Sequence, residues 1–152
     1  MNSAQQAFLL FFASMSFFYC VRGLVESQKK KNAFGLTPYL LPLGAFVWAD
    51  AVIFGLFWTL VSLAALFLQD WYLFLLIVSI FWVVRSLGET IYWFNQQFST
   101  VNRNPIENLL GKHIFHNDSI WFVYQIAWQC VTAISTVSSI YFAWMWIQTL
   151  GK

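Results

Sequence analysis

The stretch that determines the fold covers residues 39–94: YLLPLGAFVWADAVIFGLFWTLVSLAALFLQDWYLFLLIVSIFWVVRSLGETIYWF. Residues 39–68 contain one charged side chain and residues 71–94 contain two. Each segment is long enough to cross a hydrocarbon core, which takes about 20 apolar residues in a helix. Only Gln69 and Asp70 separate the segments, so we expect two helices that turn back tightly and run antiparallel as neighbours.

Further apolar segments lie on either side of this hairpin. The first lacks the basic start and the small-residue cleavage site of a signal peptide, so we expect it to remain as a span. The predicted fold is all-α: a polytopic membrane protein with an antiparallel bundle of four transmembrane helices, forming one membrane domain over residues 1–152. The predicted spans cover about residues 4–25, 39–68, 71–95 and 119–149.

The composition agrees with a membrane protein. Of the 152 residues, 60% are hydrophobic, 21% aromatic and 9% charged, whereas soluble domains have about a quarter of their residues charged. Disorder is excluded by the same numbers, and a formal net charge of +2 excludes a basic nucleic-acid-binding protein. Cys20 and Cys130 both lie in apolar runs, so we interpret them as packing residues rather than disulfide partners.

Basic residues in the loops predict the orientation. The first loop contains Arg22 and the run of residues 29–31, and the third contains Arg103 and Lys112, whereas the opposite side has only Lys152. Since short cytoplasmic loops are enriched in lysine and arginine, we expect both termini outside the cytoplasm, in a plasma or inner membrane. The third loop is also expected to form a short interfacial helix over about residues 105–110.

Three ionisable side chains lie inside the predicted spans: Asp50, Arg85 and Glu89. If the second and third spans pair about the turn, Asp50 faces Glu89 and lies one helical turn from Arg85. Arg85 and Glu89 are four residues apart and therefore share one helix face. Because each ionisable group costs about 3 kcal/mol at the centre of a membrane helix, we expect the three to meet in one buried cluster.

We expect this cluster to extend onto the last span and to bind a proton, a cation or a polar substrate. Two carboxylates that share one arginine can take up a proton between them. Tyr92, Ser86 and Thr132 keep helical spacing with the cluster and are expected to support it. The other interpretation is an ion network that only fixes helix register. The predicted binding residues are Asp50, Arg85, Glu89, Gln125 and Gln129.

A weaker metal candidate lies in the third loop. His113 and His116 are three residues apart, and Asp118 follows two residues later, a spacing that could supply ligands to one metal ion. Histidines in an interfacial loop are more typical of headgroup contacts, so no metal is predicted. We also expect no cofactor, since a haem would need axial histidines inside a span.

Three functions remain open. The first is a transport or permeation subunit built around the charged cluster, and the second is a non-catalytic accessory or assembly subunit of a larger membrane complex. The third is a lipid-acting enzyme with Glu89 or Asp50 as the base and Arg85 holding a phosphate or carboxylate. No nucleotide loop, nucleophile elbow or paired-cysteine motif occurs, so the sequence does not favour an enzyme. The expected partners are the lipid bilayer and either further copies of the chain or a membrane complex.

Overall fold

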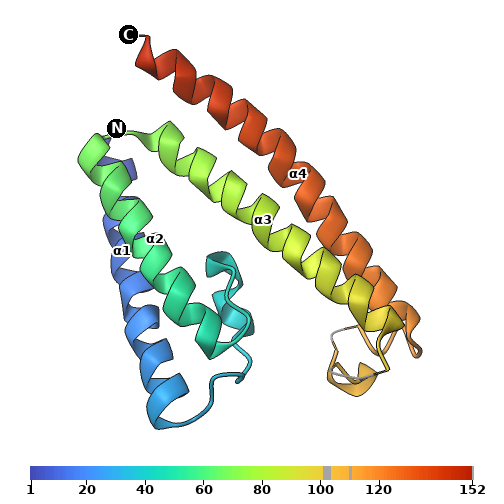
Figure 1. Cartoon of the computed structure of the whole chain (residues 1–152). Coiled ribbons are helices and arrows are strands. Elements are labelled where there is room, and N and C mark those ends of the chain that lie inside the picture. Colours follow the sequence, from blue (N-terminus) through green and yellow to red (C-terminus); the bar gives the residue numbers. More distant parts are fainter. Residues whose placement is uncertain (101–103, 110, 152) are drawn as a thin grey trace. The chain divides into compact units, whose positions relative to one another are not determined.

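The structure is a computed structural model that describes residues 1–100, 104–109 and 111–151. Within these residues it contains four long helices: α1 (Ser3–Leu24), α2 (Trp48–Leu68), α3 (Trp71–Phe98) and α4 (Ser119–Leu150) (Figure 1). All four are long and apolar enough to cross a membrane by length and composition. The predicted class, an all-α protein with four helices of membrane-spanning length, is therefore confirmed.

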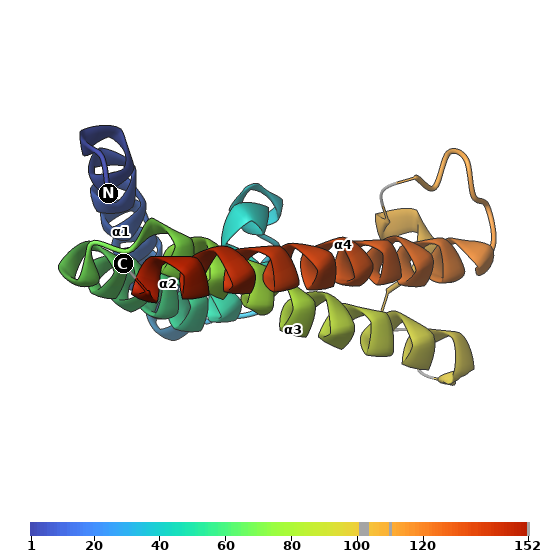
Figure 2. The same ribbon diagram turned by 90° about the horizontal axis from the view of Figure 1, so that it is seen from above.

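The chain divides into two compact units, Met1–Ile77 and Val78–Lys152, with the boundary inside α3. The first unit contains α1, α2 and the first turns of α3, and the second contains the rest of α3 and α4. Each unit is an antiparallel pair of long helices (Figures 1 and 2). The prediction that residues 1–152 form a single membrane domain stays a prediction.

Helix α1 begins with a reciprocal cap. The Asn2 side chain accepts a hydrogen bond from Gln5 N at 2.9 Å, and the Gln5 side chain accepts one from Asn2 N at 2.9 Å, which satisfies two amides at the helix start. At its other end α1 continues into a π-helical turn, Val25–Lys29, where buried Glu26 pairs with Lys30 at 2.7 Å. Residues 4–25 are thus helical throughout, and their crossing of a membrane stays a prediction.

Small residues line the contact between α1 and α2. A side chain on Gly55 would lie 2.7 Å from Ser16 O and 2.8 Å from Cys20 N, and one on Gly23 would lie 2.9 Å from Trp48 O. The two backbones therefore touch, as is typical where small residues allow membrane helices to approach closely. The small buried residues are Ala13, Ser16, Cys20 and Gly23 on α1 and Ala51, Gly55, Thr59, Ser62 and Ala65 on α2.

The turn between α2 and α3 is as tight as predicted. Gln69 adopts a left-handed conformation with φ of 52° and ends α2, and the Asp70 carboxylate accepts a hydrogen bond from Leu73 N at 3.0 Å, which caps α3. Beside the turn, Phe74 packs edge to face against Phe12 and Trp58. The first turn of α3 is therefore fixed to both helices of the first unit.

The second span does not begin where it was predicted. Residues 39–68 form an uninterrupted apolar run, but the α-helix starts only at Trp48, and Pro38–Leu43 form a 3-10 helix. Pro42 has no amide hydrogen for an α-helical bond, and Gly44 takes a left-handed φ of 73° that reverses the chain. The second span as predicted was wrong over its first nine residues, 39–47, for this reason.

This preceding segment folds back along α2 (Figure 1). The Trp58 indole donates a buried hydrogen bond to Leu43 O at 3.1 Å, and Leu40 and Leu43 are buried. Because Trp58 lies ten residues into α2, about 15 Å from its start, the segment runs beside the first half of that helix. Backbone carbonyls just before it, Gly35 O and Ala33 O, accept from the first amides of α2. We call residues 37–46 the fold-back segment.

In the second unit, aromatic rings hold α3 against α4. Trp82 stacks on Trp128 with ring centroids 6.5 Å apart, and Trp93 stacks on Tyr124 at 4.5 Å. Helix α4 agrees with the predicted span of residues 119–149. The third and fourth predicted spans are thus confirmed as helices.

The predicted interfacial helix in the third loop is shorter than expected. It is a single 3-10 turn, Ile106–Asn108, and Pro105 before it has an extended ψ of 138° instead of a helical one. The Asn104 side chain, just before this turn, donates to the side chains of Tyr92 and Gln96. Residue 110 lies outside the described residues. The prediction of a helix over residues 105–110 was therefore wrong beyond one turn.

Candidate functional site

The predicted binding residues are divided between the two units. Asp50 belongs to the first, and Arg85, Glu89, Gln125 and Gln129 belong to the second. Inside each unit, the structure shows what these side chains contact. The predicted contact of Asp50 with Arg85 and Glu89 is a contact between residues of different units, and it stays a prediction.

Asp50 lies in the first turn of α2, not inside a longer span. Its Oδ2 accepts a hydrogen bond from Phe46 N at 3.0 Å, which ties the helix start to the fold-back segment. An acid in the first turn also interacts favourably with the positive end of the helix dipole. Asp50 therefore has a structural role in the first unit, at the end of a helix that is about 30 Å long.

Arg85 and Glu89 form an ion pair on α3. The Arg85 Nη1 to Glu89 Oε1 distance is 2.9 Å, and the two side chains are only 19% and 15% exposed. The predicted placement on one helix face is confirmed. Because Arg85 lies 14 residues into α3, about 21 Å from its start, the pair is well inside the helix. The pair has no net charge when both groups are ionised.

A hydroxyl pair lies next to this ion pair. Thr132 Oγ1 on α4 donates to Ser86 Oγ on α3 at 2.8 Å, and Ser86 is fully buried. Both residues were predicted to support the site, and they join α3 to α4 at this level. Their oxygens add polar groups to a helix contact that is otherwise aromatic and aliphatic.

Side-chain amides continue the polar surface toward the loop end of the unit. Gln97 Nε2 donates to Gln125 Oε1 at 2.7 Å, and Asn104 Nδ2 donates to Tyr92 OH and, at 3.3 Å, to Gln96 Oε1. Gln125 and Tyr92 were predicted. The prediction missed Gln97 and Asn104 as members of this surface. The only sequence signal for Gln97 is the polar run that ends α3, and Asn104 lies in the loop beyond it.

Gln129 and the hydroxyls farther along α4 do not join this surface. Gln129 is exposed within the second unit, and its predicted place in an interior polar layer stays a prediction. Thr136 Oγ1 donates to Thr132 O at 2.8 Å, and Ser139 Oγ donates to Ser135 O at 2.8 Å. These hydroxyls are satisfied by their own helix, so α4 needs no docked partner to bond them.

The weak metal candidate is not assembled. His113, His116 and Asp118 are all exposed, and no group of three potential metal ligands occurs in the described part of the chain. Of the two cysteines, Cys20 is buried and Cys130 is exposed. The packing interpretation is therefore confirmed for Cys20, and for Cys130, which is exposed on α4, it stays a prediction.

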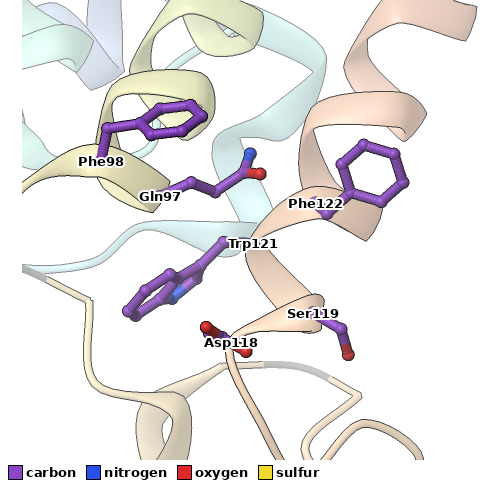
Figure 3. A pocket seen from close by; sticks show the side chains of 6 residues that line it. All are labelled: Gln97, Phe98, Asp118, Ser119, Trp121 and Phe122. Carbon is purple, nitrogen blue, oxygen red and sulfur yellow. The ribbon is translucent and has the colours of Figure 1, made fainter.

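A pocket of about 270 Å³ lies where α3 ends and α4 begins (Figure 3). It is open to the surface, and none of its residues belonged to the predicted binding set. In the close-up the Gln97 side chain extends from α3 toward the start of α4. The lining residues are Gln97, Phe98, Asp118, Ser119, Trp121 and Phe122.

No protein-family model, curated protein sequence or solved structure matches this chain. The chemistry of its own residues is therefore the basis for a function. Within the second unit, that chemistry is a neutral ion pair, a hydroxyl pair and a series of amides on the same two helices. Such groups can bind and release a proton, a cation or a small polar solute.

Proposed function

We propose that this chain is an integral membrane subunit for transport or permeation, in which Arg85 and Glu89 bind a proton, a cation or a small polar solute. The main support is the ion pair itself, 2.9 Å long and little exposed, inside a helix of membrane-spanning length. Ionisable groups at such positions cost about 3 kcal/mol each on insertion scales. Apolar residues of similar size often serve packing as well as a buried pair does, which favours a use for these charges.

The proposed mechanism follows from the pairing. When Glu89 is neutralised, by a proton or by a bound cation, the Arg85 guanidinium loses its ion-pair partner in α3 and becomes available to an anionic or polar group. The Ser86 and Thr132 hydroxyls, 2.8 Å apart, supply polar contacts beside the pair. The amides of Gln97 and Gln125 extend the polar surface toward the loop end.

The loop ends of both units are proposed to face the cytoplasm. Arg22, Lys29, Lys30 and Lys31 gather around the end of α1, which agrees with the enrichment of basic residues in cytoplasmic loops. Both termini then lie on the opposite side. Two helices enclose little volume, so we propose that further copies of the chain or a partner complete the pathway.

The test is ion flux by the purified full chain in liposomes. A potassium gradient with valinomycin drives protons, and an internal pH dye reports their entry. We expect Glu89→Gln to lower flux by at least about tenfold, equivalent to about 1.4 kcal/mol. Glu107→Gln, which removes the same charge from an exposed loop position, should retain wild-type flux. The same assay with sodium and potassium indicators tests small cations.

Two outcomes contradict the proposal. Wild-type flux in a helical, monodisperse Glu89→Gln protein would exclude the ion pair as the site. A wild-type chain that conducts no probe and purifies in fixed proportion with a different membrane protein would instead indicate an accessory subunit.

A further inference from the structure

The pocket at the loop end of the second unit is separate from the ion pair and lined by different residues. It lies between the last turn of α3, with Gln97 and Phe98, and the first turn of α4, with Asp118 and Trp121 (Figure 3). Its volume of about 270 Å³ is just below the range of about 300–1,000 Å³ for drug-sized ligands. It is therefore suited to a small group, such as one headgroup-sized substituent.

The charged group of the pocket is a carboxylate. Asp118 occupies the cap position of α4, but its side chain makes no capping hydrogen bond. Asn117 Oδ1 accepts from Ser119 N at 3.0 Å in its place. None of the six lining residues is basic. The Asp118 carboxylate thus gives the pocket a negative charge without a compensating cation in its lining.

The amide in the pocket also offers an acceptor. Gln97 Nε2 donates to Trp93 O at 3.1 Å and to Gln125 Oε1 at 2.7 Å, which uses both of its hydrogens. What Gln97 can present to a ligand is its carbonyl oxygen. A ligand in the pocket therefore meets the Gln97 carbonyl oxygen and the full negative charge of Asp118, which exceeds the partial positive charge at the start of α4 and suits a cation. The Ser119 hydroxyl can accept as well as donate.

Aromatic rings complete the lining. The Trp121 indole is held by its donation to Asn104 O at 3.2 Å, whereas Phe98 is 74% exposed and extends the apolar wall on the α3 side. The face of an indole or phenyl ring attracts cations, and rings combined with an acid are the usual recognition elements for quaternary ammonium groups.

We propose that this pocket binds an organic ammonium group. The group is either the headgroup of an amine-containing lipid or a free small amine, since both present the same chemistry. The proposal does not depend on transport through the Arg85–Glu89 pair, because neither Arg85 nor Glu89 lines the pocket.

The test uses tetramethylammonium as the probe and the full chain in nanodiscs of phosphatidylglycerol, a lipid without an amine. Ligand-observed NMR, corrected with protein-free nanodiscs, should show saturable binding. We expect Asp118→Asn to weaken binding by about fivefold and Phe98→Leu by about threefold. Neither side chain is needed for the fold, since Asp118 makes no cap bond and Phe98 is exposed. Glu107→Gln, an equal loss of charge in the same loop, should bind as the wild type does.

A second arm identifies the source of the amine. In nanodiscs of phosphatidylcholine, a raised apparent Kd for tetramethylammonium would show that the lipid headgroup competes for the pocket, and an unchanged Kd would assign the site to a free amine. The proposal is overturned if the wild type shows no saturable binding, or if Asp118→Asn binds the probe as tightly as the wild type.

Discussion

Gly55 illustrates how a single residue without a side chain determines a helix contact. Its α-carbon faces the backbone of α1 so closely that a methyl group would lie 2.7 Å from Ser16 O. Gly88, by contrast, has no atom within 4 Å of the position that a methyl group would take, apart from its chain neighbours and the backbone of its own helix. The two glycines lie inside long helices of similar composition, so they form a matched pair.

We therefore expect opposite effects from the same substitution. Gly55→Ala should destabilise the protein by about 1–3 kcal/mol, because α1 and α2 must separate. Gly88→Ala should be neutral or stabilising by up to about 1 kcal/mol, because alanine is the better helix former. Reversible unfolding in mixed micelles, followed by circular dichroism, measures both. Equal stabilities for the two variants would contradict the close contact at Gly55.

Residue spacing also decides which parts of the site could be predicted. Arg85 and Glu89 are four apart on one helix, so their pairing follows from helix periodicity alone. The bond from Gln97 to Gln125 depends on the register between α3 and α4, which a long intervening loop does not specify. The residues one or two positions from Gln97 include other polar side chains, so the sequence alone could not show which of them bonds to α4.

At the scale of the element, the apolar run of residues 39–68 contains most of the fold-back segment and all of α2, two elements that hydropathy alone does not distinguish. An apolar run predicts depth in a membrane, but it does not predict that the backbone is straight. Pro42 and Gly44 were present in the run as breakers, and they mark the end of the 3-10 turn. Local backbone chemistry therefore indicated that no α-helix runs through Pro42 and Gly44. The prediction followed the apolar run instead and placed the start of the span too early.

The Trp58 indole should hold the fold-back segment in place. Trp58→Phe removes the donor to Leu43 O and leaves a buried carbonyl unbonded, a cost of about 1–3 kcal/mol. We expect faster hydrogen exchange at Gly44 and Ala45, whose amides bond to Leu41 O and Leu40 O, with unchanged exchange in α4. Trp144→Phe, at an exposed α4 position, is the control. Unchanged protection at Gly44 in Trp58→Phe would contradict the anchoring role.

At the scale of the whole molecule, the proposed topology of four spans places both ends of the chain on the outer side of the membrane. With Cys20→Ala and Cys130→Ser as background, single cysteines at positions 2 and 151 should react with an impermeant maleimide in intact cells. A cysteine at position 29, in the basic cluster at the end of α1, should react only after permeabilisation. Labelling of only one terminus in intact cells would mean that one predicted span does not cross.

The number of long apolar helices was predictable because each is a nearly charge-free run. The turn at Gln69 joins α2 to α3, whereas the helix pairs inside the units, α1 with α2 and α3 with α4, are joined by longer loops that do not specify the pairing. The contact of Asp50 with Arg85 and Glu89 depends on packing between units, which neither periodicity nor turn chemistry specifies. Contacts in the site could thus be predicted only between residues that lie on the same helix.

The fold-back segment has a consequence for biosynthesis. Residues 38–43 leave the ribosome before Trp58 does, because the chain is made from its amino end. This apolar turn is therefore synthesised before the helix that covers Leu40 and Leu43. During that interval it is open to chaperones and proteases. Substitutions along this face of α2 should therefore reduce the yield of the protein before they alter any activity of the mature form.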